Sequence, residues 1–237
     1  IAVFLMSEVP HGQSPASLSP DERALVAHVD AHNAEALTLL ERAVNINSGT
    51  QNFAGVREVG KLFAGELDAL GFATRWVDGT PFKRAGHLVA ERPRPGQRFL
   101  LIGHLDTVFE ADSPFQKFER VNERQARGPG IIDMKGGNVI IVQTLKALHA
   151  AGALDRMHMT VVMTGDEEAA GDPQAAARAA LVAAAKGVDV AIGFEDGAGD
   201  PRSAVIGRRG TTAWTLTVTG KPAHSSQIFR PDIGYGA

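Results

Sequence analysis

Three stretches of nearly continuous apolar residues constrain the fold of this chain more than any other feature. They cover residues 98–103, 157–164 and 188–194. Strands that are apolar along their whole length are typical of sheets covered on both faces, because a sheet with one wet face alternates apolar and polar residues. Helical patterns over residues 136–150 and 173–186 lie between these stretches. Strands that alternate with helices predict an α/β fold, a three-layer sandwich with a mostly parallel central sheet.

The first part of the chain is predicted to hold helices and then short strands. The segment Ser19-Pro20-Asp21-Glu22 has the residues of a helix start, with an N-cap serine, a proline in the first turn and a glutamate that closes a capping box. Helical periodicity continues from there to about residue 46, with room for a break. A further helix and two short strands are predicted over residues 54–70, 73–77 and 87–91.

Composition excludes several kinds of chemistry. The chain of 237 residues has no cysteine, which rules out disulfides, thiol catalysis and cysteine-ligated zinc. A metal would therefore have to be held by His, Asp and Glu. The formal net charge of −3 gives no reason to expect nucleic acid or an acidic membrane surface as a partner. There is no Gly-x-Ser-x-Gly elbow, which argues against a serine hydrolase.

One histidine and several acidic residues follow the three apolar stretches. His104 and Asp106 come after the first, Glu167 and Glu168 after the second, and Glu195 after the third. In open α/β sheets, sites form at the carboxyl ends of the strands. One imidazole and several carboxylates suit a divalent metal of the zinc type. The sequence therefore predicts a hydrolase that activates water on a metal.

The spacing within these motifs indicates separate tasks. A ligating imidazole needs its second nitrogen held by a carboxylate, so we assign His104 as a ligand and Asp106 as its partner. Glu167 and Glu168 are adjacent, so one can bind metal while the other lies within hydrogen-bond reach of a bound water, as a general base must. The plainer interpretations are a surface His–Asp pair and a solvated acidic loop.

The order of these motifs resembles a known family. A further acidic residue, Asp133, lies in the segment Gly-Pro-Gly-Ile-Ile-Asp-Met-Lys-Gly-Gly of residues 128–137, just before a predicted helix. With the motifs above, this segment resembles the zinc amidohydrolase and exopeptidase family of glutamate carboxypeptidase, acetylornithine deacetylase and succinyl-diaminopimelate desuccinylase. The similarity is strongest from about residue 98 to 224. Residues 128–137 and Glu195 favour the glutamate carboxypeptidase branch.

The resemblance implies a site with two zinc ions and a role for each residue. Glu167 would be the general base and acid, with Asp106 as a second catalytic residue. Family members also carry a non-proline cis peptide after the bridging aspartate, here between Asp133 and Met134. Co²⁺ or Mn²⁺ would fit similar ligands. The implied ligands are Asp133 between both ions, His104 and Glu195 at one ion, and Glu168 at the other.

A later segment, Gly-Lys-Pro-Ala-His-Ser-Ser over residues 220–226, resembles the lid-domain signature of the family. In relatives its histidine, here His224, helps to hold the developing oxyanion in a partner subunit, which implies a homodimer formed through the lid. A turn histidine is the alternative. Alternation over residues 203–207 and 211–219 predicts antiparallel strands of this different domain. We predict a leader or disordered arm over 1–18, the N-terminal part of a catalytic metal-binding domain over 19–207, and the start of an inserted α+β lid or dimerisation domain over 208–237.

We expect the chain to be a piece of a longer protein. It begins at Ile1 and ends without an obvious closing helix or strand, and the second zinc of the family needs a histidine farther downstream. Residues 1–16 are either the remnant of a signal peptide, which would imply a periplasmic or secreted protein, or an alternative start of a cytoplasmic one.

The predicted function is zinc-dependent hydrolysis of amide or peptide bonds, of the carboxypeptidase or N-acyl-amino-acid deacylase type. Its substrate would be a small peptide or an N-acyl amino acid. Two alternatives stay open. One is a non-catalytic or truncated relative of the fold that binds metal or a partner without turnover. The other is a metal-independent α/β binding protein, which predicts no zinc uptake.

Overall fold

The computed structural model describes residues 18–195 and the short stretches 203–207, 210, 214–220, 223–227 and 230–232. The chain divides into two units, Ile1–Asp196 and Gly197–Ala237. In the described part of the second unit, the single regular element is the 3₁₀ turn η4 (Ser225–Gln227). The predicted domain boundaries stay predictions, as does the lid domain.

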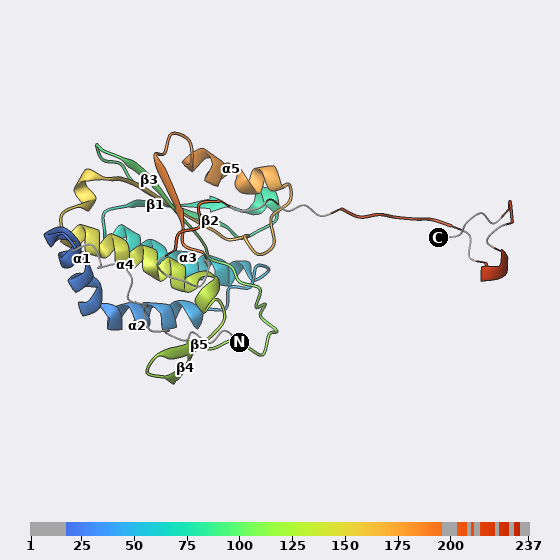
Figure 1. The fold of residues 1–237 in the computed structure, drawn as a ribbon, viewed down its shortest axis with the longest axis horizontal. Helices are drawn as coiled ribbons and strands as arrows, with labels where there is room; N and C mark the ends of the chain where they lie inside the picture. Colours follow the sequence, from blue (N-terminus) through green and yellow to red (C-terminus); the bar gives the residue numbers. More distant parts are fainter. Residues whose placement is uncertain are drawn as a thin grey trace, which may run out of the picture. The chain divides into compact units, whose positions relative to one another are not determined.

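A five-stranded sheet forms the middle layer of the first unit (Figure 1). β3 lies between β6 and β7 and is parallel to both, whereas β2 is antiparallel to its neighbours β1 and β6. Four of the five strands therefore share one direction, which confirms the mostly parallel sheet predicted from the sequence. The strands, in sheet order, are β1 (Ala73–Asp78), β2 (Gly86–Arg92), β6 (His158–Thr164), β3 (Arg98–His104) and β7 (Val190–Gly193).

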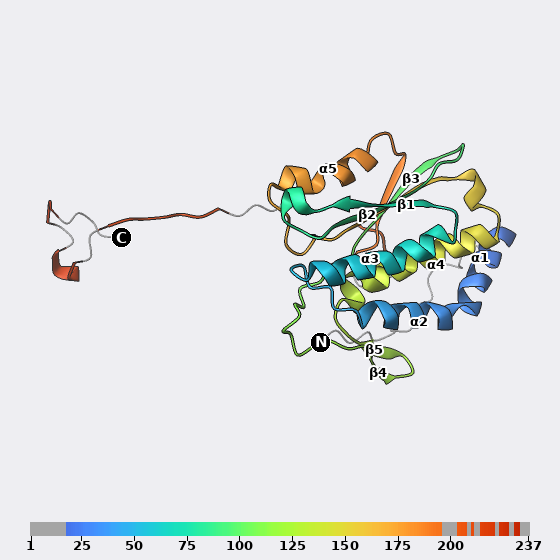
Figure 2. The same cartoon turned by 180° about the vertical axis from the view of Figure 1, so that it is seen from behind.

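Helices cover both faces of the sheet, as Figures 1 and 2 show from opposite sides. α3 and α4 lie against one face, α5 lies on the other, and α1 and α2 pack against α4. The three layers are therefore helix, sheet and helix. The bounds of the helices are α1 (Pro20–Ala31), α2 (Asn33–Val44), α3 (Phe53–Asp68), α4 (Gly136–Ala150) and α5 (Gln174–Ala184). No helix among the described residues is both long and apolar enough to cross a membrane.

The two faces of the sheet contribute to two apolar cores. The larger core lies under α3 and α4 and takes Leu88, Leu101 and Val161 from the three central strands. The smaller core lies under α5 and takes the residues next to them in the chain, Val89, Leu100 and Val162. Successive side chains of a strand point to opposite faces of the sheet. Because both faces are covered here, the side chains on both faces have to be apolar. This explains the continuous apolar stretches at 98–103 and 157–164.

The helix starts and breaks follow local chemistry. The predicted capping box is present: the backbone N–H of Ser19 donates to Oε2 of Glu22 at 2.7 Å, and the N–H of Glu22 donates to Oγ of Ser19 at 3.2 Å. The predicted break in the first helical region falls at His32, which separates α1 from α2. The short turn η1 (Thr80–Phe82) lies between β1 and β2, and η3 (Leu154–Arg156) lies between α4 and β6.

Two details of the predicted structure were wrong, and one element was not predicted. The third apolar stretch is not a buried strand: β7 is shorter and largely exposed, because among the described residues it pairs only with β3 and so forms a sheet edge. The element that was not predicted is a hairpin between β3 and α4, formed by β4 (Glu119–Asn122) and β5 (Gln125–Arg127). Strands were predicted over 203–207 and 211–219, but the described residues 203–207 and 214–219 form none, and residues 211–213 lie outside the described part. An alternating pattern cannot by itself supply the pairing partner that a strand requires.

Candidate metal centre

The ends of three neighbouring strands bring the predicted site residues together. β6, β3 and β7 are adjacent and parallel, so the residues that follow them leave the same edge of the sheet. His104 is the last residue of β3, and Glu195 follows β7 after Phe194. Glu167 and Glu168 lie in the turn after β6.

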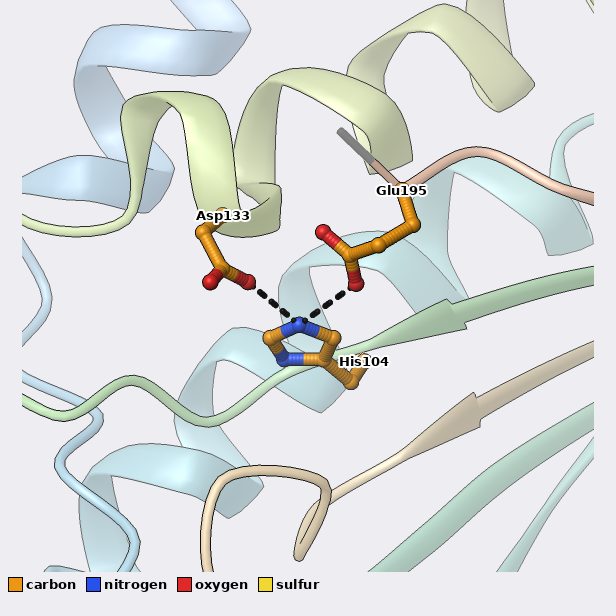
Figure 3. A group of neighbouring side chains, drawn as sticks. All are labelled: His104, Asp133 and Glu195. Carbon is orange, nitrogen blue, oxygen red and sulfur yellow. Dashed lines mark hydrogen bonds and ion pairs between the residues drawn. The ribbon is translucent and has the colours of Figure 1, made fainter. Parts of the chain in front are cut away.

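His104, Asp133 and Glu195 form a compact cluster of possible metal ligands (Figure 3). Nε2 of the buried His104 lies 2.8 Å from Oδ1 of Asp133 and 3.1 Å from Oε2 of Glu195. One ligand atom from each residue lies within 4.8 Å of the other two. The Asp133 and Glu195 side chains are 56% and 33% exposed, so the cluster is open on the carboxylate side. One imidazole nitrogen and two carboxylates are donors that zinc takes in proteins.

Asp133 reaches this cluster from an irregular turn just before α4. The turn, η2 (Ile131–Lys135), starts after Gly130, whose φ of 72° lies in the left-handed region that favours glycine. Asp133 itself has non-helical dihedrals, and the predicted cis peptide between Asp133 and Met134 is present. The buried Lys135 ties the turn to the end of α2, since its Nζ donates to the backbone O of Ile46 at 2.9 Å. Burial lowers the pKa of Lys135 to about 7.

Asp106 is buried and connects the exits of β3 and β6. Its Oδ1 accepts the backbone N–H of Glu167 at 3.0 Å, and its Oδ2 accepts the N–H of Glu168 at 3.2 Å. Oγ1 of Thr50 also donates to Oδ2, at 2.7 Å. Nδ1 of His104 lies 3.0 Å from the backbone O of Asp106 but 3.5 Å from its Oδ1. The nearest partner of this ring nitrogen is therefore the carbonyl, and the carboxylate mainly holds the turn with the two glutamates.

The turn after β6 is also held from the side of α5. The buried carboxylate of Asp166 accepts the N–H of Gly171 at 2.8 Å and pairs with Arg178 of α5. Nδ1 of His87, on β2, accepts the N–H of Gly165 at 3.2 Å. Nε2 of His87 lies 2.8 Å from the backbone O of Ala177, to which it donates when Nδ1 accepts. The sequence analysis identified neither the contacts of Asp166 nor those of His87. The sequence feature that could have pointed to His87 is a histidine inside an otherwise apolar predicted strand.

The charges of the cluster act on one another. Burial would lower the pKa of His104, but hydrogen bonds and charge attraction from Asp106 and Glu195 outweigh it and raise that pKa to about 11. The pKa of Asp133 is raised by burial and by repulsion from Glu195. For Asp106, burial acts upward, but the hydrogen bonds of His104 and Thr50 leave the pKa below its usual value.

The pKa values of the two glutamates after β6 are raised, as that of Asp133 is, by burial and by neighbouring carboxylates. Burial and repulsion by Asp133 raise the pKa of Glu168 to about 7. Burial also raises the pKa of Glu167, against the attraction of His104 and with repulsion from Glu195. Carboxylates whose pKa values rise because they crowd one another are stabilised by a nearby cation. The residues present therefore fit a bound divalent metal.

Besides Asp106 and Glu167, two more predicted site residues, Glu168 and His224, lie outside the compact cluster. Glu168 faces the same charges, since Asp133 shifts its pKa, but it is not part of the group with ligand atoms within 4.8 Å of one another. His224 belongs to the second unit, where its exposed imidazole Nδ1 lies 2.9 Å from Oγ of Ser226. The catalytic and ligand roles of both residues stay predictions.

Comparison with known proteins identifies relatives of this chain. The sequence profile described as peptidase family M20/M25/M40 matches residues 100–225. Carboxypeptidase G2 of Pseudomonas sp. (strain RS-16) is 33% identical over 208 residues, 84% of this chain and 47% of the relative. Succinyl-diaminopimelate desuccinylase of Variovorax paradoxus (strain S110) is 28% identical over 202 residues, 79% of this chain and 50% of the relative. The chain thus spans about half the length of these relatives.

Solved structures share the fold. Human carnosine dipeptidase 1 matches with a TM-score of 0.62 and 20% identity, over 72% of this chain and 40% of that one. The di-peptidase Dug1p from Saccharomyces cerevisiae matches with a TM-score of 0.59 and 17% identity, over the same shares of the two chains. At these identities the likeness concerns the fold alone.

Proposed function

Because the chain belongs to peptidase family M20/M25/M40, we propose that it is part of a zinc-dependent hydrolase of peptide or amide bonds, of the carboxypeptidase or N-acyl-amino-acid deacylase type. The observation that carries this proposal is the convergence of His104, at the end of β3, Glu195, after β7, and Asp133, in the turn before α4. The names of the two curated relatives, a carboxypeptidase and a desuccinylase, support it. The substrate would be a small peptide or an N-acyl amino acid.

The proposed ligands divide between two ions. His104 and Glu195 would complete one site, Glu168 would belong to the other, and Asp133 would bridge them. A bound zinc ion lowers the pKa of its water towards about 7 and polarises the carbonyl of the scissile bond. Co²⁺ and Mn²⁺ accept similar donors, so the ligands alone do not select zinc.

Glu167 is the proposed general base and acid. Its backbone N–H is fixed by the carboxylate of Asp106 at 3.0 Å, which limits the positions that its own side chain can reach. Burial raises its pKa, so the carboxylate is a better proton acceptor than an exposed glutamate would be. It would take a proton from the attacking water and return that proton to the nitrogen that leaves when the amide bond breaks.

The resemblance of residues 220–226 to a lid signature supports a further proposal. The longer protein would form a homodimer through this lid domain, and His224 would serve the partner's site by holding the developing oxyanion. Light scattering on the full-length protein tests the dimer. A monomer at the concentration at which turnover is measured would reject it.

The function is tested by hydrolysis assays on the full-length protein. A panel of dipeptides and N-acyl amino acids is offered to zinc-loaded protein, to protein stripped with a chelator, and to stripped protein with zinc restored. We expect release of an amino acid, its loss on stripping and its return with zinc. Stoichiometric zinc uptake without hydrolysis of any substrate would favour the non-catalytic alternative, and no zinc uptake would favour the metal-independent one.

A further inference from the structure

Asn138, in the first turn of α4, lies completely buried beside the metal centre. Its Nδ2 donates to the backbone O of His104 at 2.6 Å. Its Oδ1 has no hydrogen-bond partner among the described residues. A buried polar atom without a partner destabilises the folded state. Among the described residues, this side chain keeps one atom unpaired while its amide nitrogen donates to the backbone of His104, the histidine of the cluster.

The strand and the helix approach each other closely at this contact. A Cβ atom on Gly103, the residue before His104, would lie 2.2 Å from Oδ1 of Asn138 and 3.1 Å from Cε of Met134. Real Cβ atoms do not come as near as the first distance. Glycine at position 103 therefore leaves free the space that the amide of Asn138 occupies where it reaches the carbonyl of His104.

The same helical turn also meets the segment that carries Glu195. A Cβ atom on Gly137 would lie 2.1 Å from the backbone O of Phe194, the residue before Glu195. Asp133 is joined to this turn through Lys135, the residue before Gly136. All three members of the cluster are thus fixed to the start of α4. Asp133 is held by the chain, His104 by the amide of Asn138, and Glu195 by backbone packing against Gly137.

We propose that Asn138 is a positioning residue for the metal, because it sets the place of His104 relative to Asp133. It touches neither substrate nor metal. Removing the groups that orient a metal ligand typically weakens metal binding about 10–100-fold. This inference rests on the proposed function only in requiring a metal at the His104 cluster; it makes no use of substrate or turnover.

The test compares two variants on one helix. Asn138→Leu removes the bond to His104, and Gln143→Leu is the matched control. Gln143 is also a buried amide of α4, 7% exposed, and its Nε2 has no hydrogen-bond partner among the described residues. No hydrogen bond joins its side chain to a proposed ligand in the described part of the chain. Zinc affinity of the full chain is measured by competition with a chromophoric chelator. The free energy of unfolding is measured without metal.

We expect Asn138→Leu to bind zinc about 10–100-fold more weakly than the wild type, while Gln143→Leu binds it normally and both fold without metal. Equal zinc affinity in the Asn138 variant and the wild type would overturn the proposal, as would equal weakening in both variants. A wild-type chain that binds no zinc would instead reject the proposed function.

Gly103→Ala tests the same contact from the strand. The added methyl group displaces the Asn138 amide, so zinc affinity should fall as it does in Asn138→Leu. If Asn138→Leu does not fold, Asn138→Ser, which adds no bulk, takes its place in the zinc titration. If neither Asn138 variant folds without metal, Asn138 is a core residue of the fold and the positioning role is rejected.

Discussion

The carboxylate of Asp106 accepts the backbone N–H of Glu167 at 3.0 Å, so the segment after β3 holds the segment after β6 in place. The same carboxylate holds the N–H of Glu168 and is itself held by Thr50. One buried acid therefore couples the strand that carries the proposed ligand His104 to the turn that carries the proposed general base. The predictions below test this arrangement and the roles built on it.

Glu167→Ala should abolish turnover in the full-length protein, with a loss of about 10²–10⁴-fold or more, while metal content stays nearly unchanged. The reason is that Glu167 is proposed to move a proton and not to bind metal. Hydrolysis rates and zinc content are measured on the same preparation. Glu123→Ala, at an exposed glutamate between β4 and β5, is the control. A variant that has lost its zinc would show that Glu167 is a ligand.

Asp133→Ala should lose both metal ions, because its carboxylate is proposed to bridge them. Elemental analysis after dialysis against a limiting concentration of zinc gives the occupancy. Asp112→Ala, at an exposed aspartate outside the cluster, should retain the wild-type metal content. Full occupancy in the Asp133 variant would refute the bridging role.

His87→Leu should destabilise the fold although His87 is not a metal ligand. It leaves the N–H of Gly165 and the carbonyl of Ala177 without their imidazole partner, at a cost of about 1–3 kcal/mol for each buried group. Turnover should fall as well, since the turn with Glu167 loses one support. Chemical denaturation measures the first effect, with the exposed His149→Leu as control. Unchanged stability would show that the two bonds contribute little.

Asp155→Asn should lower stability at neutral pH and have little effect in strong acid. The hydrogen bond from the buried Arg92 holds the pKa of Asp155 below its ordinary value of 3.8. A carboxyl with a depressed folded pKa stabilises the fold above its unfolded pKa, and this contribution is lost as the pH falls through the folded pKa. Denaturation at pH 7 and near pH 2, beside the exposed Asp30→Asn, measures the difference. An equal effect at both pH values would contradict it.

The sequence predicted the elements that depend on local pattern. The continuous apolar stretches of β3 and β6 indicated a sheet covered on both faces. The capping box at Ser19 and Glu22 marked the start of α1. It overestimated the burial of β7, because apolar composition does not say whether a strand lies at the centre or at an edge of its sheet.

For the site, the motifs predicted which residues lie close together, but not which contacts hold those residues in place. His104, Asp133 and Glu195 do meet; the sequence showed His104 and Glu195 after apolar stretches and Asp133 in a glycine-containing segment before a predicted helix. Contacts of Asn138 with His104 and of His87 with Gly165 join positions 34 and 78 residues apart. Such contacts depend on how strands and helices pack, and one sequence carries no signal for them.

The most direct measurement is anomalous X-ray diffraction at the zinc edge from crystals of the zinc-loaded chain. The account predicts a zinc peak at roughly 2.0–2.2 Å from a nitrogen of His104 and from carboxylate oxygens of Asp133 and Glu195. A zinc peak elsewhere in the chain, with these three side chains empty of metal, would contradict it.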